Sequence, residues 1–303
     1  MNEYLTEDNN INAILKSKEP IALNDLIYVI PPYSENYKNI FVPQRFEDTI
    51  ICHIISLYLS QDAYYNPPIY LAIKGDAGEG KTAQTIATCT QKGCFVIYIS
   101  ASVLSGSHEN EAKEKLQKIY DYALQLRMKN LTAIVIDDFH KGIVNEDVNI
   151  KKTINTNILI GYMMNLAEHN GSAHVPIILT ANDLSNVYAP LLRNGRADLF
   201  LWKPSFDEKR DIVHHILSSF ISEKDESAFN KFFKKYSNQN VAFFSQLKNA
   251  WRKELLKQLI HKVPNFDNTN LIRINSLINS YKLELTYADL NKLADTILKE
   301  REI

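Results

Sequence analysis

Short apolar runs alternate with amphipathic segments from residue 41 to residue 206. The apolar runs are rich in Val, Ile and Leu and lie at 69–73, 95–99, 131–136 and 175–179. Continuous apolar runs of this kind predict strands that are covered on both faces. Apolar positions recur at helical spacing in the segments 41–60, 109–126 and 153–168. Strands that alternate with helices predict an α/β fold, with a parallel sheet flanked by helices.

The strand pattern stops after residue 206. Only helical patterns follow, at 207–221, 228–236, 242–261 and 287–301. This change predicts a small all-helical domain, 207–303, after an α/β domain, 41–206. Residues 1–40 combine polar runs with Pro31 and Pro32 and show weak helical periodicity, so we expect them to form an N-terminal leader.

The loop after the first of these strands matches G-x-x-x-x-G-K-[ST]. It reads Gly75-Asp76-Ala77-Gly78-Glu79-Gly80-Lys81-Thr82. Its glycines allow several backbone N–H groups to point at one phosphate chain, and a helix predicted from Thr82 adds its positive end. In this motif Lys81 contacts the β- and γ-phosphates, and the Thr82 hydroxyl binds Mg²⁺. A chance glycine-rich turn is the alternative, and the strand–loop–helix setting disfavours it.

Polar residues follow two further predicted strands. Asp137 and Asp138 end the strand that contains residues 133–136, and Asn182 follows the strand at 175–179. We assign Asp137 to Mg²⁺, through its water shell, and Asp138 to the attacking water. Asn182 is the candidate contact to the γ-phosphate or that water. An acidic strand-end turn and an ordinary Asn-Asp turn are the alternatives, and the upstream phosphate loop makes them the weaker interpretations.

Two arginines, Arg193 and Arg196, lie on either side of Gly195. A guanidinium can contact two phosphate oxygens at once and neutralise charge in a phosphoryl-transfer transition state. The order of the motifs favours arginine fingers that reach a triphosphate on a neighbouring subunit, which would require an oligomeric ring. Surface salt bridges are the alternative for such a pair.

These motifs resemble those of AAA+ ATPases, and among them the Rubisco activases most closely. The most specific likeness is in residues 174–204, which include Asn182, Arg193 and Arg196 and continue into Phe200-Leu201-Trp202-Lys203-Pro204. Shorter likenesses cover 41–46, 104–109, 153–167, 239–244 and 285–298. The resemblance therefore extends over residues 40 to 300.

The resemblance implies an AAA+ P-loop domain followed by a helical lid domain. It implies an ATP-dependent protein remodeller that hydrolyses ATP with Mg²⁺ in a homo-oligomeric ring, expected to be a hexamer, and acts on a protein client of open identity. The first pore loop would lie at 102–109, where Val103 and Leu104 are the only apolar residues and no aromatic occurs. The second would lie within 141–152 and include Lys151 and Lys152.

Four positions depart from the related families. The activases carry Asn where this chain has Asp137, and AAA+ ATPases usually carry Glu where it has Asp138. The activases have two arginines in the sensor 2 helix, where this chain has Lys248 and Ala250. Lys248 is therefore the remaining candidate for a positive contact to the nucleotide from the lid.

Charge, hydropathy and cysteine spacing limit the partners and the cellular location that we expect. The net charge is −1, which indicates no global preference for nucleic acid, and no apolar run is long enough to span a membrane. The polar N-terminus is unlike a secretory signal, and Cys52, Cys89 and Cys94 show no zinc-ligand spacing. We expect buried thiols and a cytoplasmic protein without a membrane partner.

Two other functions stay open. A nucleic-acid-associated AAA+ ATPase, of the helicase-loader or transposition-regulator type, would use basic residues at 248–262 that interleave with Phe243, Phe244 and Trp251. A solvated amphipathic helix is the preferred interpretation of that segment. A nucleotide-dependent switch with negligible hydrolysis would follow if Asp138 fails to replace Glu.

Overall fold

The computed structural model describes residues 17–24, 27–59, 66–104, 110–140, 150–168, 174–185, 189–218, 220–221, 225–260, 268–280 and 285–301. The chain divides into two compact units, Met1–Lys203 and Pro204–Ile303. Each unit has its own hydrophobic core. No helix in these described ranges is long and apolar enough to cross a membrane.

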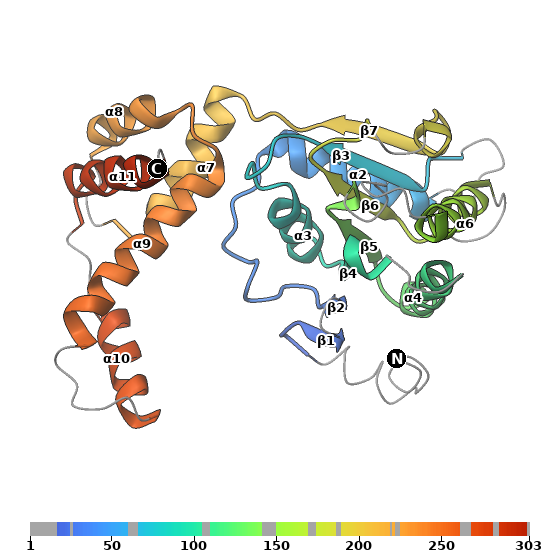
Figure 1. The fold of residues 1–303 in the computed structure, drawn as a ribbon, viewed down its shortest axis with the longest axis horizontal. Coiled ribbons are helices and arrows are strands. Elements are labelled where there is room, and N and C mark those ends of the chain that lie inside the picture. Colours follow the sequence, from blue (N-terminus) through green and yellow to red (C-terminus); the bar gives the residue numbers. More distant parts are fainter. Residues whose placement is uncertain are drawn as a thin grey trace. The chain divides into compact units, whose positions relative to one another are not determined.

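The first unit is built on a seven-stranded sheet with the order β1-β2-β4-β5-β6-β3-β7 (Figure 1). The strands are β1 (Ile21–Asn24), β2 (Ile27–Ile30), β3 (Tyr70–Lys74), β4 (Phe95–Ser100), β5 (Thr132–Asp137), β6 (Ile177–Ala181) and β7 (Ala197–Leu201). Strands β3 to β7 run parallel to one another. The α/β fold expected from the sequence is therefore confirmed.

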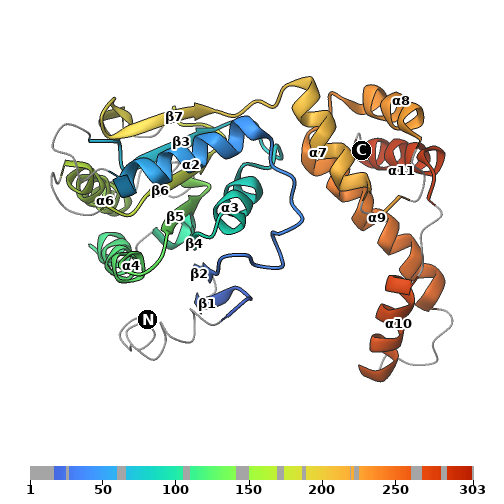
Figure 2. The same cartoon turned by 180° about the vertical axis from the view of Figure 1, so that it is seen from behind.

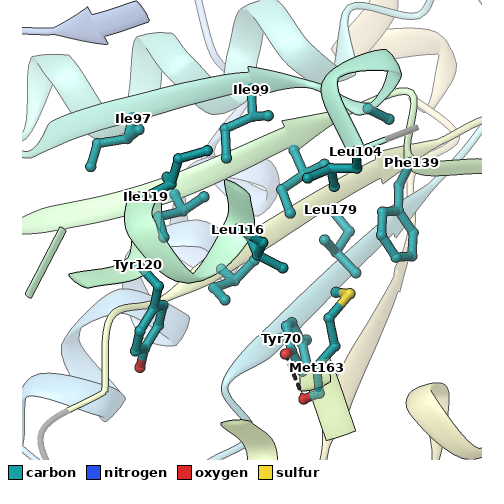
Figure 3. Packing of buried hydrophobic residues seen from close by; sticks show 14 of the residues in the cluster. Tyr70, Ile97, Ile99, Leu104, Leu116, Ile119, Tyr120, Phe139, Met163 and Leu179 are labelled. Carbon is teal, nitrogen blue, oxygen red and sulfur yellow. Dashed lines mark hydrogen bonds between the residues drawn. The ribbon is translucent and has the colours of Figure 1, made fainter. Parts of the chain in front are cut away.

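Helices cover both faces of this sheet (Figure 2). They are α2 (Gln44–Leu59), α3 (Lys81–Gln91), α4 (Glu111–Arg127) and α6 (Ile150–Glu168). Leu116 and Ile119 of α4 and Met163 of α6 pack against alternate residues of β4 and β5, and Tyr70 donates a hydrogen bond of 2.7 Å to the Met163 carbonyl (Figure 3). Helices α2 and α3 lie on the opposite face.

A hairpin at the edge of the sheet arises from the segment expected to be a leader. Strand β1 pairs with β2, and β2 pairs antiparallel with β4, so that Tyr28 lies opposite Tyr98. The two strands have four residues each, and β2 pairs with a strand far along the chain, which helical periodicity cannot reveal. Part of the region 1–40 therefore extends the sheet.

The second unit contains helices throughout its described part. They are α7 (Phe206–Ser218), α8 (Glu226–Tyr236), α9 (Val241–Ile260), α10 (Asn268–Ser280) and α11 (Tyr287–Arg301). The core is aromatic, with Phe229, Phe232, Phe233 and Phe244 buried together. Asp225 caps α8 by accepting hydrogen bonds from the amides of Ser227 and Ala228 at 2.8 and 3.3 Å. The helical C-terminal region is confirmed, and α10 is an addition that the sequence pattern did not predict.

Candidate nucleotide-binding site

The phosphate loop connects β3 to α3, and two of its glycines are required by geometry. Gly80 precedes the first residue of α3 with a φ of 78°, in the left-handed region that favours glycine. A Cβ at Gly75 would lie 2.2 Å from the carbonyl oxygen of Trp202. A side chain at Gly80 would therefore strain the backbone of the loop, and a side chain at Gly75 would prevent the loop from lying against the residue that follows β7.

Trp202, which follows β7, supports the phosphate loop through a hydrogen bond to the loop backbone. Its indole Nε1 donates a hydrogen bond of 2.9 Å to the Glu79 carbonyl, which also accepts one of 3.1 Å from Gln84. The ring is buried, packs at 4.7 Å against Phe46 of α2, and lies 4.9 Å from the Arg45 guanidinium carbon. Trp202 lies within the block of resemblance, 174–204, but no local sequence pattern indicates this supporting role.

Lys81 and Asn182 meet at the end of the sheet. The Lys81 ammonium donates hydrogen bonds to the carbonyl oxygens of Gly75 and Asp76, at 2.7 and 2.9 Å, and to Asn182 Oδ1 at 2.8 Å. Burial lowers the pKa of Lys81, and the nearby carboxylates of Asp138 and Asp137 oppose that shift. The two predicted phosphate contacts thus share one site although they lie far apart in the sequence.

The loop that carries Asn182 is anchored by its neighbour. Asp183 accepts hydrogen bonds from the backbone and side chain of Ser185, at 3.1 and 2.6 Å, and pairs with Lys74 at 3.1 Å. The Ser185 hydroxyl, followed by Lys74, holds the pKa of Asp183 well below its usual range. The anion is therefore stabilised at the turn that presents Asn182.

Asp137 and Thr82 form the second half of the site. The Thr82 hydroxyl donates a hydrogen bond to Asp137 Oδ1, and the Thr180 hydroxyl donates another at 2.6 Å. On the other carboxylate oxygen, Oδ2, Tyr98 donates a hydrogen bond of 3.0 Å. Burial, followed by the Asp137 charge, raises the pKa of Tyr98 above its ordinary value, so the phenol keeps its proton.

These oxygens fit a magnesium ion that is held chiefly by phosphates and water. No group of three or more His, Cys, Asp or Glu side chains suited to a metal occurs among the described residues. Mg²⁺ bound to a nucleotide needs only one or two protein oxygens. The Thr82 hydroxyl supplies one such oxygen, and the Asp137 carboxylate beside it is placed to hold the ion through its water shell.

Asp138 has a backbone conformation that is uncommon for its residue type. Its φ is 53°, and its amide donates a hydrogen bond of 3.3 Å to the Thr180 hydroxyl. Aspartate tolerates the left-handed region better than most residues do. Thr180 therefore links both acidic residues to the strand beside them.

The two arginines have different surroundings. Arg196 donates a hydrogen bond of 2.6 Å to the Pro190 carbonyl and pairs with Glu168 of α6. Arg193 is exposed, and no hydrogen bond or ion pair joins its side chain to another described residue. Both remain predicted fingers, but Arg196 already has partners in its own chain.

Other predicted positions lie elsewhere. Lys248 lies on α9 in the helical unit, and its contact to a nucleotide stays a prediction. Val103 and Leu104 are buried in the core of the first unit, which makes them unsuitable for gripping a client. The remaining pore-loop residues, 105–109 and 141–149, and the side chains of Lys151 and Lys152 lie outside the described residues.

Two further expectations are changed by burial. Phe243 and Phe244 are fully buried in the helical core, so they cannot belong to a basic–aromatic surface on α9. Cys89 and Cys94 are buried as expected, whereas Cys52 is exposed. The expectation of three buried thiols is therefore wrong for Cys52, which lies on the outer side of α2.

Comparison with known proteins defines the class. Residues 71–205 match the family model described as "ATPase family associated with various cellular activities (AAA)". The fold matches the crystal structure of the FIGL-1 AAA domain with a TM-score of 0.63, over 96% of this chain and 90% of that chain, at 13% identity. The fold of the first unit is therefore that of an AAA domain.

Curated relatives make the resemblance more specific. The chain is 30% identical to the ribulose bisphosphate carboxylase/oxygenase activase of Anabaena sp. over 253 residues, which is 78% of this chain and 60% of that protein. The Nostoc sp. protein of the same name gives the same values, and the chloroplastic protein of Solanum pennellii is 26% identical over 250 residues, covering 78% of this chain and 53% of that protein. Residues 71–205 of this chain therefore carry a domain of the AAA type, and the chain resembles Rubisco activase in sequence. It spans at most 60% of the length of these relatives.

Proposed function

We propose that this protein hydrolyses ATP with Mg²⁺ and uses the energy to remodel a protein client. The observation that carries the proposal is the convergence of Lys81, Thr82, Asp137 and Asn182 at the carboxyl ends of neighbouring strands. Ligands of open parallel sheets bind at this edge. A buried ammonium, a hydroxyl beside a carboxylate and an amide are the groups that phosphoryl transfer requires there.

Lys81 has to exchange partners when a triphosphate binds. An ammonium has three N–H donors, and Gly75, Asp76 and Asn182 already accept three hydrogen bonds from it. Phosphate oxygens are stronger acceptors than carbonyl oxygens because they are charged. The expected exchange would free Asn182 to contact the γ-phosphate or the attacking water.

Asp138 is the residue proposed to polarise that water. It follows Asp137 directly and is linked to Thr180 through its amide, so its backbone is held next to the magnesium-binding pair. When bound, Mg²⁺ would neutralise charge on the phosphates, and Thr82 and Asp137 would hold it. Asp138 carries the side chain that is one methylene shorter than the usual Glu, which makes a slow rate the expected behaviour.

The arginines and the helical unit complete the proposal. Arg193 is exposed and is the better candidate for a finger that reaches the neighbouring subunit in a ring, whereas Arg196 would act from a partnered position. The helical unit would serve as the lid, with Lys248 as its contact to the nucleotide. Ring assembly, expected as a hexamer, is supported by the resemblance to Rubisco activases.

Steady-state phosphate release tests the enzymatic part. We expect magnesium-dependent hydrolysis by the wild type and none by Lys81→Ala, since that change removes the ammonium that donates hydrogen bonds to the Gly75 and Asp76 carbonyls of the loop. Hydrolysis that persists in Lys81→Ala or with EDTA would contradict the proposal. The Asp138→Asn variant, with ATP bound but not hydrolysed, should retain a client protein in a pull-down, and Lys81→Ala is the matched control that should not.

The client is left open by the comparisons. The relatives are named for ribulose bisphosphate carboxylase/oxygenase, so that enzyme is the first client to test. Stimulation of hydrolysis by an inhibited form of the carboxylase would support an activase role. Stimulation by single- or double-stranded DNA instead would favour the nucleic-acid-associated alternative.

A further inference from the structure

Tyr98 lies on β4, and its side chain points to the face of the sheet that carries the nucleotide-binding residues. Its neighbours Ile97 and Ile99 point the other way, into the core beneath α4 (Figure 3). Because side chains alternate along a strand, Tyr98 is directed away from that core. Strand β4 pairs with β5 so that Ser100 lies opposite Asp137, and Tyr98 lies two residues earlier. The phenol therefore reaches along its strand to the acidic residue at the end of the next one.

The two oxygens of the Asp137 carboxylate accept hydrogen bonds from different donors. Oδ1 accepts from the hydroxyls of Thr82 and Thr180, and the Thr180 bond measures 2.6 Å. Oδ2 accepts from the Tyr98 hydroxyl at 3.0 Å. The last torsion of an aspartate side chain is broad, so a carboxylate held at one oxygen alone can rotate. Donors on both oxygens define the plane of the group.

We propose that Tyr98 is a positioning residue for Asp137. By donating to Oδ2, Tyr98 holds that oxygen on the β4 side, so that Oδ1 faces Thr82. This proposal rests on the magnesium role proposed for Asp137 and Thr82. Thr82 is assigned to the metal, so only Tyr98 and Thr180, among the donors described above, remain dedicated to the carboxylate. Partners that orient a metal ligand commonly change metal affinity by tenfold or more when they are removed.

The edge hairpin supports this arrangement. Tyr28 of β2 lies opposite Tyr98 in the antiparallel ladder, and the two ring centroids are 6.1 Å apart. Aromatic pairs across neighbouring strands stabilise both side chains. The edge hairpin, which ends at Ile30, thus contributes Tyr28 to the packing of the proposed positioning residue.

Metal binding separates positioning from general support of the fold. Mn²⁺ would replace Mg²⁺ and be titrated by electron paramagnetic resonance in the presence of a non-hydrolysable ATP analogue. A fluorescent nucleotide in EDTA would report binding without metal. In Tyr98→Phe, which keeps the ring and removes the hydroxyl, we expect Mn²⁺ affinity to fall about tenfold and metal-free nucleotide affinity to change less than about twofold.

Two further variants make the result decisive. Tyr122→Phe is the matched control, since the Tyr122 hydroxyl on α4 is buried without a hydrogen-bond partner among the described residues, and it should change neither affinity. Asp137→Ala is the reference for loss of the metal ligand. An unchanged Mn²⁺ affinity in Tyr98→Phe, with a weakened one in Asp137→Ala, would overturn the positioning role and leave the proposed function standing. Absence of nucleotide-dependent Mn²⁺ binding in the wild type would overturn both.

Discussion

A methyl group added at Gly75 tests how tightly the phosphate loop packs against the end of β7. The Cβ of Gly75→Ala would lie 2.2 Å from the Trp202 carbonyl oxygen, a backbone atom that cannot rotate away. The same stretch is tied by hydrogen bonds from the Trp202 amide to Lys74, at 2.6 Å, and from the Gly75 amide to Ala181, at 3.3 Å. The loop or the strand end therefore has to move.

The expected cost follows from overpacking, because Gly75 is not among the residues with a positive φ and alanine can adopt its backbone conformation. Inserting a group into a well-packed site destabilises a protein by about 1 to 3 kcal/mol. Gly161→Ala in α6 is the control, since no heavy atom of the described residues lies within 4 Å of a Cβ built there. That change should stabilise the helix by about 0.5 to 1 kcal/mol.

Urea denaturation followed by tryptophan fluorescence can resolve the two effects. The chain has two tryptophans. They are Trp202 in the first unit and Trp251 in the second, so a Trp251→Phe background makes Trp202 the only reporter. We expect a lower unfolding midpoint and weaker nucleotide binding in Gly75→Ala, and a higher midpoint with unchanged binding in Gly161→Ala. If Gly75→Ala is as stable as the wild type, the described contact between the loop and Trp202 is wrong.

Three other outcomes are expected. Burial lowers the pKa of His53 to about 4 in the folded protein, whereas the unfolded chain takes up this proton near 6.5. The free energy of unfolding should therefore fall by up to about 3 kcal/mol as the pH drops from 6.5 to 4, and His53→Gln should show a smaller dependence on pH. Arg196→Ala should lower the melting temperature because it leaves Glu168 without its ion pair, whereas Arg193→Ala should stay within about 0.5 kcal/mol of wild type. Asp138→Glu should raise the hydrolysis rate, and a wild-type rate at background would indicate a nucleotide-dependent switch.

Sequence patterns predicted the part of the site in which each residue's role follows from its place in a motif. Lys81 and Thr82 come from a loop of defined spacing, and Asp137 and Asn182 end buried strands whose carboxyl ends meet at one edge of a parallel sheet. Their mutual contacts are a consequence of that topology. This is why two groups separated by a hundred residues could be assigned to one phosphate.

The supporting residues could not be predicted in this way. Tyr98 acts across a strand pair, and Trp202 reaches back to Glu79 from the far end of the first unit, so neither role has a local signature. In β7 only Ala197 is buried, so its burial does not follow the alternation expected of a strand, and β1 and β2 are short edge strands. Phe243 and Phe244 were expected on a surface and are buried instead, because the packing of α9 directs them into the core and the sequence does not show that packing.

A subunit-mixing experiment tests most directly whether the site is shared in a ring. Lys81→Ala removes the phosphate-loop cation and Arg193→Ala removes the exposed arginine, so each variant alone should be inactive. In an equimolar mixture of reassembled subunits, roughly a quarter of the interfaces should combine an intact loop with an intact arginine and recover that share of wild-type hydrolysis. A mixture as inactive as either parent would contradict a site completed by the neighbouring subunit.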